Sequence, residues 1–188
     1  EWRRRSVVLK PLISEFEDVP LPDARLTTRL KGIVEVLGEH PAASFPDLFE
    51  DPSELEGFYR FINNERVKPD ELLQGHRDRT LERCEDHQVV LAIHDSSEFA
   101  FPGERQGLSK LRKGESGFLG HFSLMVSPSG QPLGILAYST VARQVRHGSN
   151  WLANYNDPNK ESLRWGRQAA EVTELVGAKR VVHVMDRE

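Results

Sequence analysis

Two short apolar runs rich in β-branched residues, each followed by an aspartate, constrain this chain most. The first covers residues 89–94 and precedes Asp95, and the second covers residues 181–185 and precedes Asp186. Runs of this length and composition are typical of buried strands. If the two strands are parallel neighbours, both carboxylates project from one edge of the sheet, where open α/β sheets hold their ligands. Carboxylate oxygens suit Mg²⁺ or Mn²⁺ beside a phosphate group.

The pattern around these runs predicts the rest of a sheet. Apolar and β-branched residues indicate further strands, a Ser-Pro-Ser-Gly stretch indicates a hairpin turn, and a helical pattern ends at Gly177. The predicted strands are 117–126, 133–141 and 180–185, with the turn at 127–130 and the helix at 162–176. A right-handed crossover through that helix places the last strand parallel to another core strand.

Helical patterns fill the chain before residue 88. The first predicted helix carries an apolar stripe and has Asp23 as its N-cap. A Ser-x-x-Glu capping box at Ser53 starts a second helix. Pro69 leads into a third helix over residues 70–84. The stripe consists of Leu26, Leu30, Ile33 and Leu37. The sequence therefore predicts a helical region over residues 1–87 and a sheet-containing region over 88–188, an α+β or α/β chain.

Composition limits the setting of the protein. The 188 residues carry a net charge of -4, so only local basic clusters argue for nucleic acid. A single cysteine, Cys84, excludes an internal disulfide, and no apolar stretch approaches the 20 residues of a membrane-spanning helix. A reducing cytosol is the expected compartment. Because the chain starts at Glu1 without a methionine and ends at Glu188, we expect a fragment or a processed chain.

Local basic clusters provide the candidates for DNA contact. One pair lies one helical turn apart, a second candidate is an arginine with an asparagine three residues later, and a third is a flexible basic loop at 105–120. These residues are Arg25 and Arg29, then Arg60 and Asn63, then Lys110, Arg112 and Lys113. The simpler interpretations are a solvated surface for Arg25 and Arg29, a salt-bridged Arg60 and an ordinary hairpin connection for the loop, and from the residues alone the first two are favoured.

The candidate metal ligands also have simpler interpretations. Each aspartate alone fits a turn or cap that ends a strand. His94 and His183 lie near the aspartates, but no paired cysteines or His-x-x-x-His spacing supports zinc. We therefore expect structural or solvent-facing roles for these histidines.

Four segments in order carry a family resemblance. They are the Asp-x-Arg-Leu-x-x-Arg-Leu stretch within residues 21–30, the Tyr-Arg-Phe-x-x-Asn stretch within 57–64, and the two aspartate blocks at 93–97 and 184–188. Together they resemble the N-terminal part of the DDE transposases of bacterial insertion sequences, in particular the insertion-sequence-4 group with its Tn-5-like enzymes. The resemblance implies an N-terminal DNA-binding region followed by the first part of an RNase H-like core.

The resemblance also implies a mechanism and partners. Asp95 and Asp186 match the metal ligands of a cut-and-paste DNA transposase, which uses two Mg²⁺ (or Mn²⁺) ions to cleave phosphodiesters and transfer strands. The third carboxylate of the family is a glutamate far downstream, and Glu188 does not match it. The implied partners are the double-stranded DNA of transposon ends and a second copy of the full-length enzyme, in the bacterial cytoplasm at the nucleoid and away from membranes.

Two other functions remain open from the sequence. A non-catalytic DNA-binding or inhibitory transposase fragment would occupy the ends without cutting them. An RNase H-like metal-dependent nuclease would hydrolyse DNA without strand transfer, because water and a 3′-hydroxyl use the same metals.

Overall fold

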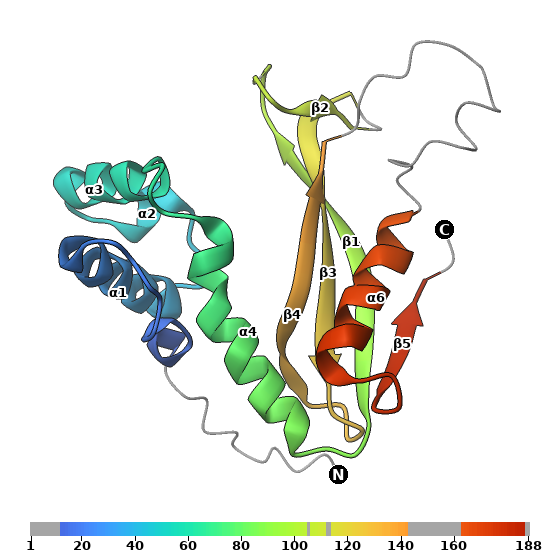
Figure 1. Cartoon of the computed structure of the whole chain (residues 1–188). Coiled ribbons are helices and arrows are strands. Elements are labelled where there is room, and N and C mark those ends of the chain that lie inside the picture. Colours follow the sequence, from blue (N-terminus) through green and yellow to red (C-terminus); the bar gives the residue numbers. More distant parts are fainter. Residues whose placement is uncertain (1–11, 105, 112–113, 143–162, 187–188) are drawn as a thin grey trace, which may run out of the picture. The chain divides into compact units, whose positions relative to one another are not determined.

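The chain folds into two compact units that meet within one helix, α4 (Pro69–Glu85), between Arg79 and Thr80. The first unit is helical, and the second consists mainly of a mixed sheet with α6 (Figure 1). This confirms the α+β prediction, whereas the functional division at residue 87 stays a prediction. The computed structural model describes residues 12–104, 106–111, 114–142 and 163–186.

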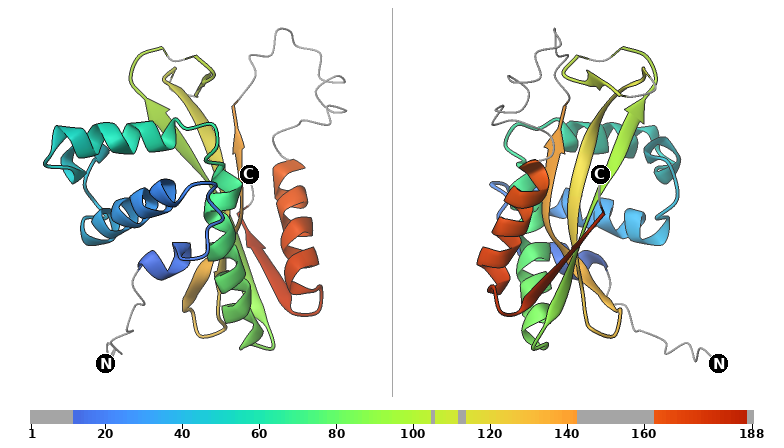
Figure 2. Two further views of the ribbon diagram at one scale, coloured as in Figure 1. Left: turned by 60° about the vertical axis from the view of Figure 1, so that its left-hand side comes forward. Right: turned by 90° about the vertical axis from the view of Figure 1, so that its right-hand side faces the viewer.

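The first unit packs its helices around one apolar cluster. Helices α1 and α3 lie side by side (Figures 1 and 2), and both contribute to that cluster. Its elements are a 3-10 helix, η1 (Leu12–Phe16), and the helices α1 (Ala24–Glu39), α2 (Phe45–Leu48), α3 (Pro52–Ile62) and the first part of α4. The buried residues of the cluster are Val19, Leu30, Ile33, Val34, Phe58, Phe61 and Val67. The apolar stripe predicted on the first helix is therefore confirmed.

The two longer helices before α4 start at aspartate caps. The Asp23 carboxylate accepts a hydrogen bond from the Arg25 backbone N–H at 2.8 Å, as the sequence predicts. The capping box predicted at Ser53 is wrong, because Asp51 caps α3 and accepts from the Ser53 N–H at 2.8 Å. Pro52 takes the first helical position, where its fixed φ fits and its missing N–H costs nothing.

The second unit is a mixed five-stranded sheet. Strand β3 lies between β1 and β4 and is antiparallel to both, whereas β5 is parallel to β1 on its other side. The short β2 pairs with the start of β3. The order of the longer elements along the chain agrees with the sequence-based prediction, and the last strand is parallel to a core strand as the crossover predicts, whereas β2 was not predicted. The elements are β1 (Val90–Phe101), β2 (Ser109–Lys110), β3 (Ser116–Val126), β4 (Pro132–Val141), α6 (Leu163–Val176) and β5 (Val181–Met185).

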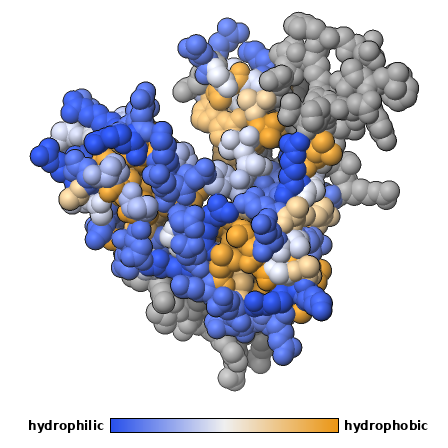
Figure 3. Space-filling view, in the orientation of Figure 1, coloured by the Kyte–Doolittle hydropathy of each residue, from blue (hydrophilic) through white to orange (hydrophobic). Residues whose placement is uncertain are grey.

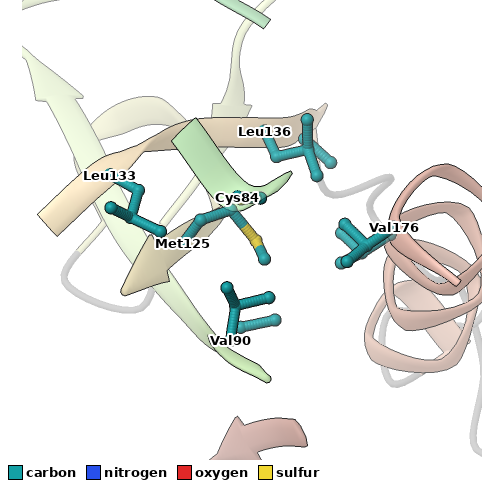
Figure 4. Packing of buried hydrophobic residues seen from close by; sticks show 9 residues of the cluster. Cys84, Val90, Met125, Leu133, Leu136 and Val176 are labelled. Carbon is teal, nitrogen blue, oxygen red and sulfur yellow. The ribbon is translucent and has the colours of Figure 1, made fainter. Parts of the chain in front are cut away.

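The two faces of this sheet differ in burial. Helix α6 packs on one face, and Cys84 at the end of α4 joins the same core (Figure 4). The buried cluster consists of Cys84, Val90, Ala92, Met125, Leu133, Leu136, Ala137, Val172 and Val176. On β5, Val182 and Val184 alternate with the partly buried Val181 and His183 and remain 49% and 44% exposed.

Strand β1 is longer than the sequence predicts. The prediction ended it before Asp95, but it continues to Phe101 because β3 keeps pairing with it, from Asp95 opposite Phe122 to Phe101 opposite Ser116. Stacked rings of Phe99 and Phe118, 5.0 Å apart, stabilise the extension. Asp95 therefore lies within a strand and does not end it.

The core predicts a contrast between neighbouring residues on β4. Leu136 is fully buried, whereas the adjacent Ile135 is 39% exposed. Leu136→Ala should lower the free energy of unfolding by about 2–5 kcal/mol, because it leaves a cavity under α6. Ile135→Ala is the matched control and should cost clearly less. Urea unfolding measures both, and equal losses would contradict the assignment of the two faces.

Candidate functional site

A groove between α1 and α3 brings two predicted DNA-binding residues together. It has a volume of about 690 Å³, and both Arg25 and Arg29 line it. Its apolar lining includes Ile33, Val36, Phe49 and Phe58. In the space-filling view, hydrophobic surface shows between hydrophilic side chains over these helices (Figure 3). The carboxylates of Glu35 and Glu54 also line the groove, so its charge is mixed.

A smaller hollow adjoins the groove and shares Arg29 with it. This hollow has a volume of about 200 Å³, and its second cationic side chain is Arg60. The other lining residues are Leu26, Ser53, Gly57, Phe61 and Asn64, none of which is acidic. The smaller hollow is therefore the more electropositive of the two.

The arginines differ in the partners they have. Arg25 and Arg29 are exposed, and their side chains make no hydrogen bond or ion pair with any residue that the structure describes. The guanidinium of Arg60 donates to the Glu56 carboxylate at 2.6 Å, and both side chains are well exposed, at 77% and 62%. An exposed pair of this kind contributes about 0.3–0.5 kcal/mol and exchanges readily for a phosphate.

The asparagine in the smaller hollow is Asn64, not the predicted Asn63. Asn63 caps the C-terminus of α3 with its backbone N–H bonded to the Tyr59 carbonyl, and its side chain is exposed. Asn64 accepts a hydrogen bond from the Arg66 N–H at 3.0 Å, which holds its side chain locally. The role of Asn63 in DNA contact stays a prediction.

Gly57 is a residue whose importance sequence reasoning missed. It lies inside α3, where glycine costs about 0.5–1 kcal/mol relative to alanine. A Cβ atom at this position would overlap the Arg29 guanidinium, with its Cζ only 2.7 Å away. The sequence signal was an isolated glycine inside an amphipathic helix, which often marks a close packing contact.

The predicted basic loop is described only in part. Lys110 lies in β2, is exposed, and approaches the Glu104 carboxylate at 3.5 Å. It lines a hollow of about 350 Å³ together with Glu104 and Ser116. Arg112 and Lys113 lie outside the described residues.

Asp95 and Asp186 lie at the same level of the sheet. In the parallel pairing of β1 with β5, His94 is opposite Met185, and each aspartate is the next residue along its chain. Neighbouring strands are roughly 4.8 Å apart, so this register brings the two backbones close. Both aspartates are exposed, and one Asp95 oxygen accepts from the Ser96 N–H at 2.8 Å. Within the described ranges, no group of three or more acidic, histidine or cysteine side chains is arranged to hold a metal ion.

A chain of buried hydrogen bonds runs beneath the aspartates. His94 is 2% exposed; its Nδ1 lies 2.8 Å from Ser123 Oγ, and its Nε2 lies 2.8 Å from His183 Nδ1. His183 Nε2 in turn lies 2.9 Å from the Thr173 hydroxyl of α6. The two histidines thus connect three strands and α6, which agrees with the structural role expected for them.

The hydrogen-bond donors fix one direction along this chain. The Gln168 amide donates to Ser123 Oγ at 2.8 Å, so the Ser123 hydroxyl can donate to Nδ1 of His94. Nε2 of His94 then donates to His183, and Nε2 of His183 donates to Thr173. We assign both imidazoles as neutral Nε2–H tautomers, because this direction gives each ring one donated and one accepted hydrogen bond.

Burial keeps these histidines neutral. Desolvation is the largest cause that lowers the pKa of His94, and together with the neighbouring His183 and His121 it brings this pKa to about 4. Desolvation also lowers the pKa of His183. In the folded state, both histidines of this hydrogen-bonded chain therefore resist protonation below neutral pH.

Comparison with known proteins connects the first unit to DNA. Residues 11–67 match the family described as Transposase DNA-binding, and this segment contains η1, α1, α2, α3 and the arginine-lined groove. This segment is therefore similar to the DNA-binding region of transposases, and the match supports DNA as a partner. A search of curated proteins gave no match. None of the helices in the described ranges combines the length and hydropathy needed to cross a bilayer.

The buried histidines predict how stability depends on pH. Below the unfolded pKa of about 6.5, the unfolded chain takes up protons that folded His94 refuses until about pH 4. The free energy of unfolding should therefore fall as pH drops through this window, by on the order of 1–3 kcal/mol from this group. Urea unfolding between pH 7 and pH 4 measures it, with His94→Gln as the comparison. An equal pH slope in the variant would contradict the prediction.

Proposed function

We propose that this chain is the DNA-binding region and the first part of the RNase H-like core of a DDE transposase of the insertion-sequence-4 group. The α1/α3 groove and the adjoining hollow bind transposon ends, and Asp95 with Asp186 serves phosphodiester cleavage and strand transfer. The observation that carries the proposal is the pair Arg25 and Arg29, which have no partner in the described chain and line a groove inside the matched DNA-binding segment.

The arginines supply the chemistry that a DNA backbone needs. A guanidinium offers a planar set of N–H donors that fits two phosphate oxygens at once, and it keeps its charge at any working pH. Arg25 and Arg29 have no carboxylate to give up before they bind. Such contacts hold the duplex in place without reading its sequence.

The second unit supports the catalytic half of the proposal by its topology. A mixed sheet with β5 parallel to β1 brings Asp95 and Asp186 to neighbouring positions, and both side chains are exposed. One or two carboxylates beside substrate phosphates are the usual protein ligands of Mg²⁺, so this donor set fits that ion. When bound there, Mg²⁺ supplies activation of water and of a 3′-hydroxyl and stabilisation of the leaving oxygen. His94 and His183 hold the two strands in register beneath the carboxylates.

The resemblance supplies the remaining parts of the proposal. The enzyme would act in the bacterial cytoplasm at the nucleoid, as a homodimer on paired DNA ends. A non-catalytic chain that occupies transposon ends is the second candidate. It is favoured by the extent of the family match, which covers residues 11–67 and by itself supports DNA binding alone.

The arginine pair predicts a loss of DNA affinity. Arg25→Ala and Arg29→Ala should each weaken binding of a duplex and reduce the slope of log K against log salt by about 0.9, because each removes one phosphate contact. Lys31→Ala is the matched control, since Lys31 is exposed on the same helix and does not line the groove. Fluorescence anisotropy over a salt series measures all three. Unchanged affinity in both arginine variants would refute the groove as the DNA-binding surface.

The aspartate pair predicts a shared metal site. Mn²⁺ binding by calorimetry should be lost in Asp95→Ala and in Asp186→Ala, because each removes one ligand, while DNA affinity stays within about twofold of the parent. Glu98→Ala is the control, since Glu98 is an exposed carboxylate three positions along β1 and on its opposite face. Mn²⁺ binding that persists in both aspartate variants would favour the non-catalytic alternative. Cleavage without strand transfer would favour a nuclease.

A further inference from the structure

We propose that the smaller hollow binds one backbone phosphate of DNA and that Gly57 is the positioning residue that seats Arg29 there. This inference rests on the proposed DNA binding by the α1/α3 surface. It adds a specific ligand group, a specific place on the surface and a residue that acts by positioning Arg29.

The position of Arg29 depends on a missing side chain. Arg29 extends from α1 toward α3, and its guanidinium occupies the space that a Cβ atom at Gly57 would need. The Cζ of Arg29 would lie 2.7 Å from that Cβ and Nη2 would lie 3.3 Å from it. The guanidinium therefore lies against the backbone of α3, at the boundary between the large groove and the smaller hollow.

Charge distinguishes the two spaces as sites for an anion. The groove includes Glu35 and Glu54, which repel a phosphate, whereas no carboxylate lines the smaller hollow. Two guanidinium groups, Arg29 and Arg60, face that hollow from different helices. Arg29 has no anionic partner in the described chain, and Arg60 has only an exposed pair with Glu56. Two cations around a hollow without a carboxylate match the charge of a phosphate diester held between them.

The hollow also offers neutral polar groups beside the arginines. Ser53 lies in the first turn of α3, and Asn64 lies just beyond its end, so polar groups line the hollow at both ends of that helix. Hydroxyl and amide groups accompany arginine at many phosphate contacts. The apolar side chains of Leu26 and Phe61 form the rest of the lining. The lining thus combines two positively charged arginines, two neutral polar residues and apolar side chains.

The Gly57→Ala substitution tests DNA binding without destabilising the fold. The clashing atoms belong to the end of a flexible side chain, so Arg29 can move away while α1 and α3 stay packed. Alanine also favours the helix more than glycine does. The change should therefore leave the fold intact and remove only the seat of the guanidinium.

The experiment uses the full chain, a fluorescent mixed-sequence DNA duplex and four variants. Gly57→Ala should weaken binding roughly 3- to 10-fold and lower the salt slope by about one contact, as Arg29→Ala does. The double variant should bind no more weakly than either single variant. Gly166→Ala is the matched control, because this glycine lies within helix α6, lines neither the groove nor the smaller hollow, and has open space where its Cβ would be. It should bind like the parent.

Thermal unfolding accompanies the titrations. The melting temperature of Gly57→Ala should equal or exceed that of the parent, because the substitution suits the helix. A Gly57→Ala chain that binds like the parent, while Arg29→Ala binds more weakly, overturns this inference and leaves the proposed function standing. A further loss on adding Gly57→Ala to Arg29→Ala also overturns it, since the glycine would then act through another residue. Parent-like binding by both Arg25→Ala and Arg29→Ala instead overturns the proposed function itself.

Discussion

The parallel pairing of β1 with β5 is the constraint on which the candidate catalytic site depends. Its register places Ile93 opposite Val184 and brings Asp95 and Asp186 level with each other. A shift of β5 by one residue would turn His183 away from α6 and toward the open face, because β3 holds β1 in place. The hydrogen bond between His94 and His183 opposes such a shift, because it exists only in this register.

The histidine chain also explains why a polar network is tolerated in this core. Its members bond to one another in a single direction, from Gln168 through Ser123 and the two histidines to Thr173. A satisfied network specifies one arrangement of strands, whereas each unpaired group would cost about 1–3 kcal/mol. The requirement is that both imidazoles stay neutral, and burial ensures this by lowering their pKa values.

In the first unit, charged side chains remain exposed above a well-packed apolar cluster. Leu30 and Ile33 bury one side of α1, so Arg25 and Arg29 remain at the surface. Glycine at position 57 makes α3 less stable than alanine would, but it leaves space for the Arg29 guanidinium against α3. Because each unit has its own apolar cluster, the proposed DNA-binding surface and the carboxylate pair are built independently.

The sequence by itself determined the longer helices and strands, because caps, stripes and turn residues act over a few positions, whereas the short η1, α2 and β2 were not predicted. The cap at Asp23, the turn at Gly130 with its φ of 84° and the strand before Asp186 are examples. It also pointed to Arg29 and to both aspartates as candidates. Only the tertiary structure extended β1, joined His94 to His183 and set Arg29 against Gly57. These features depend on contacts between residues far apart in the chain, which no local pattern encodes.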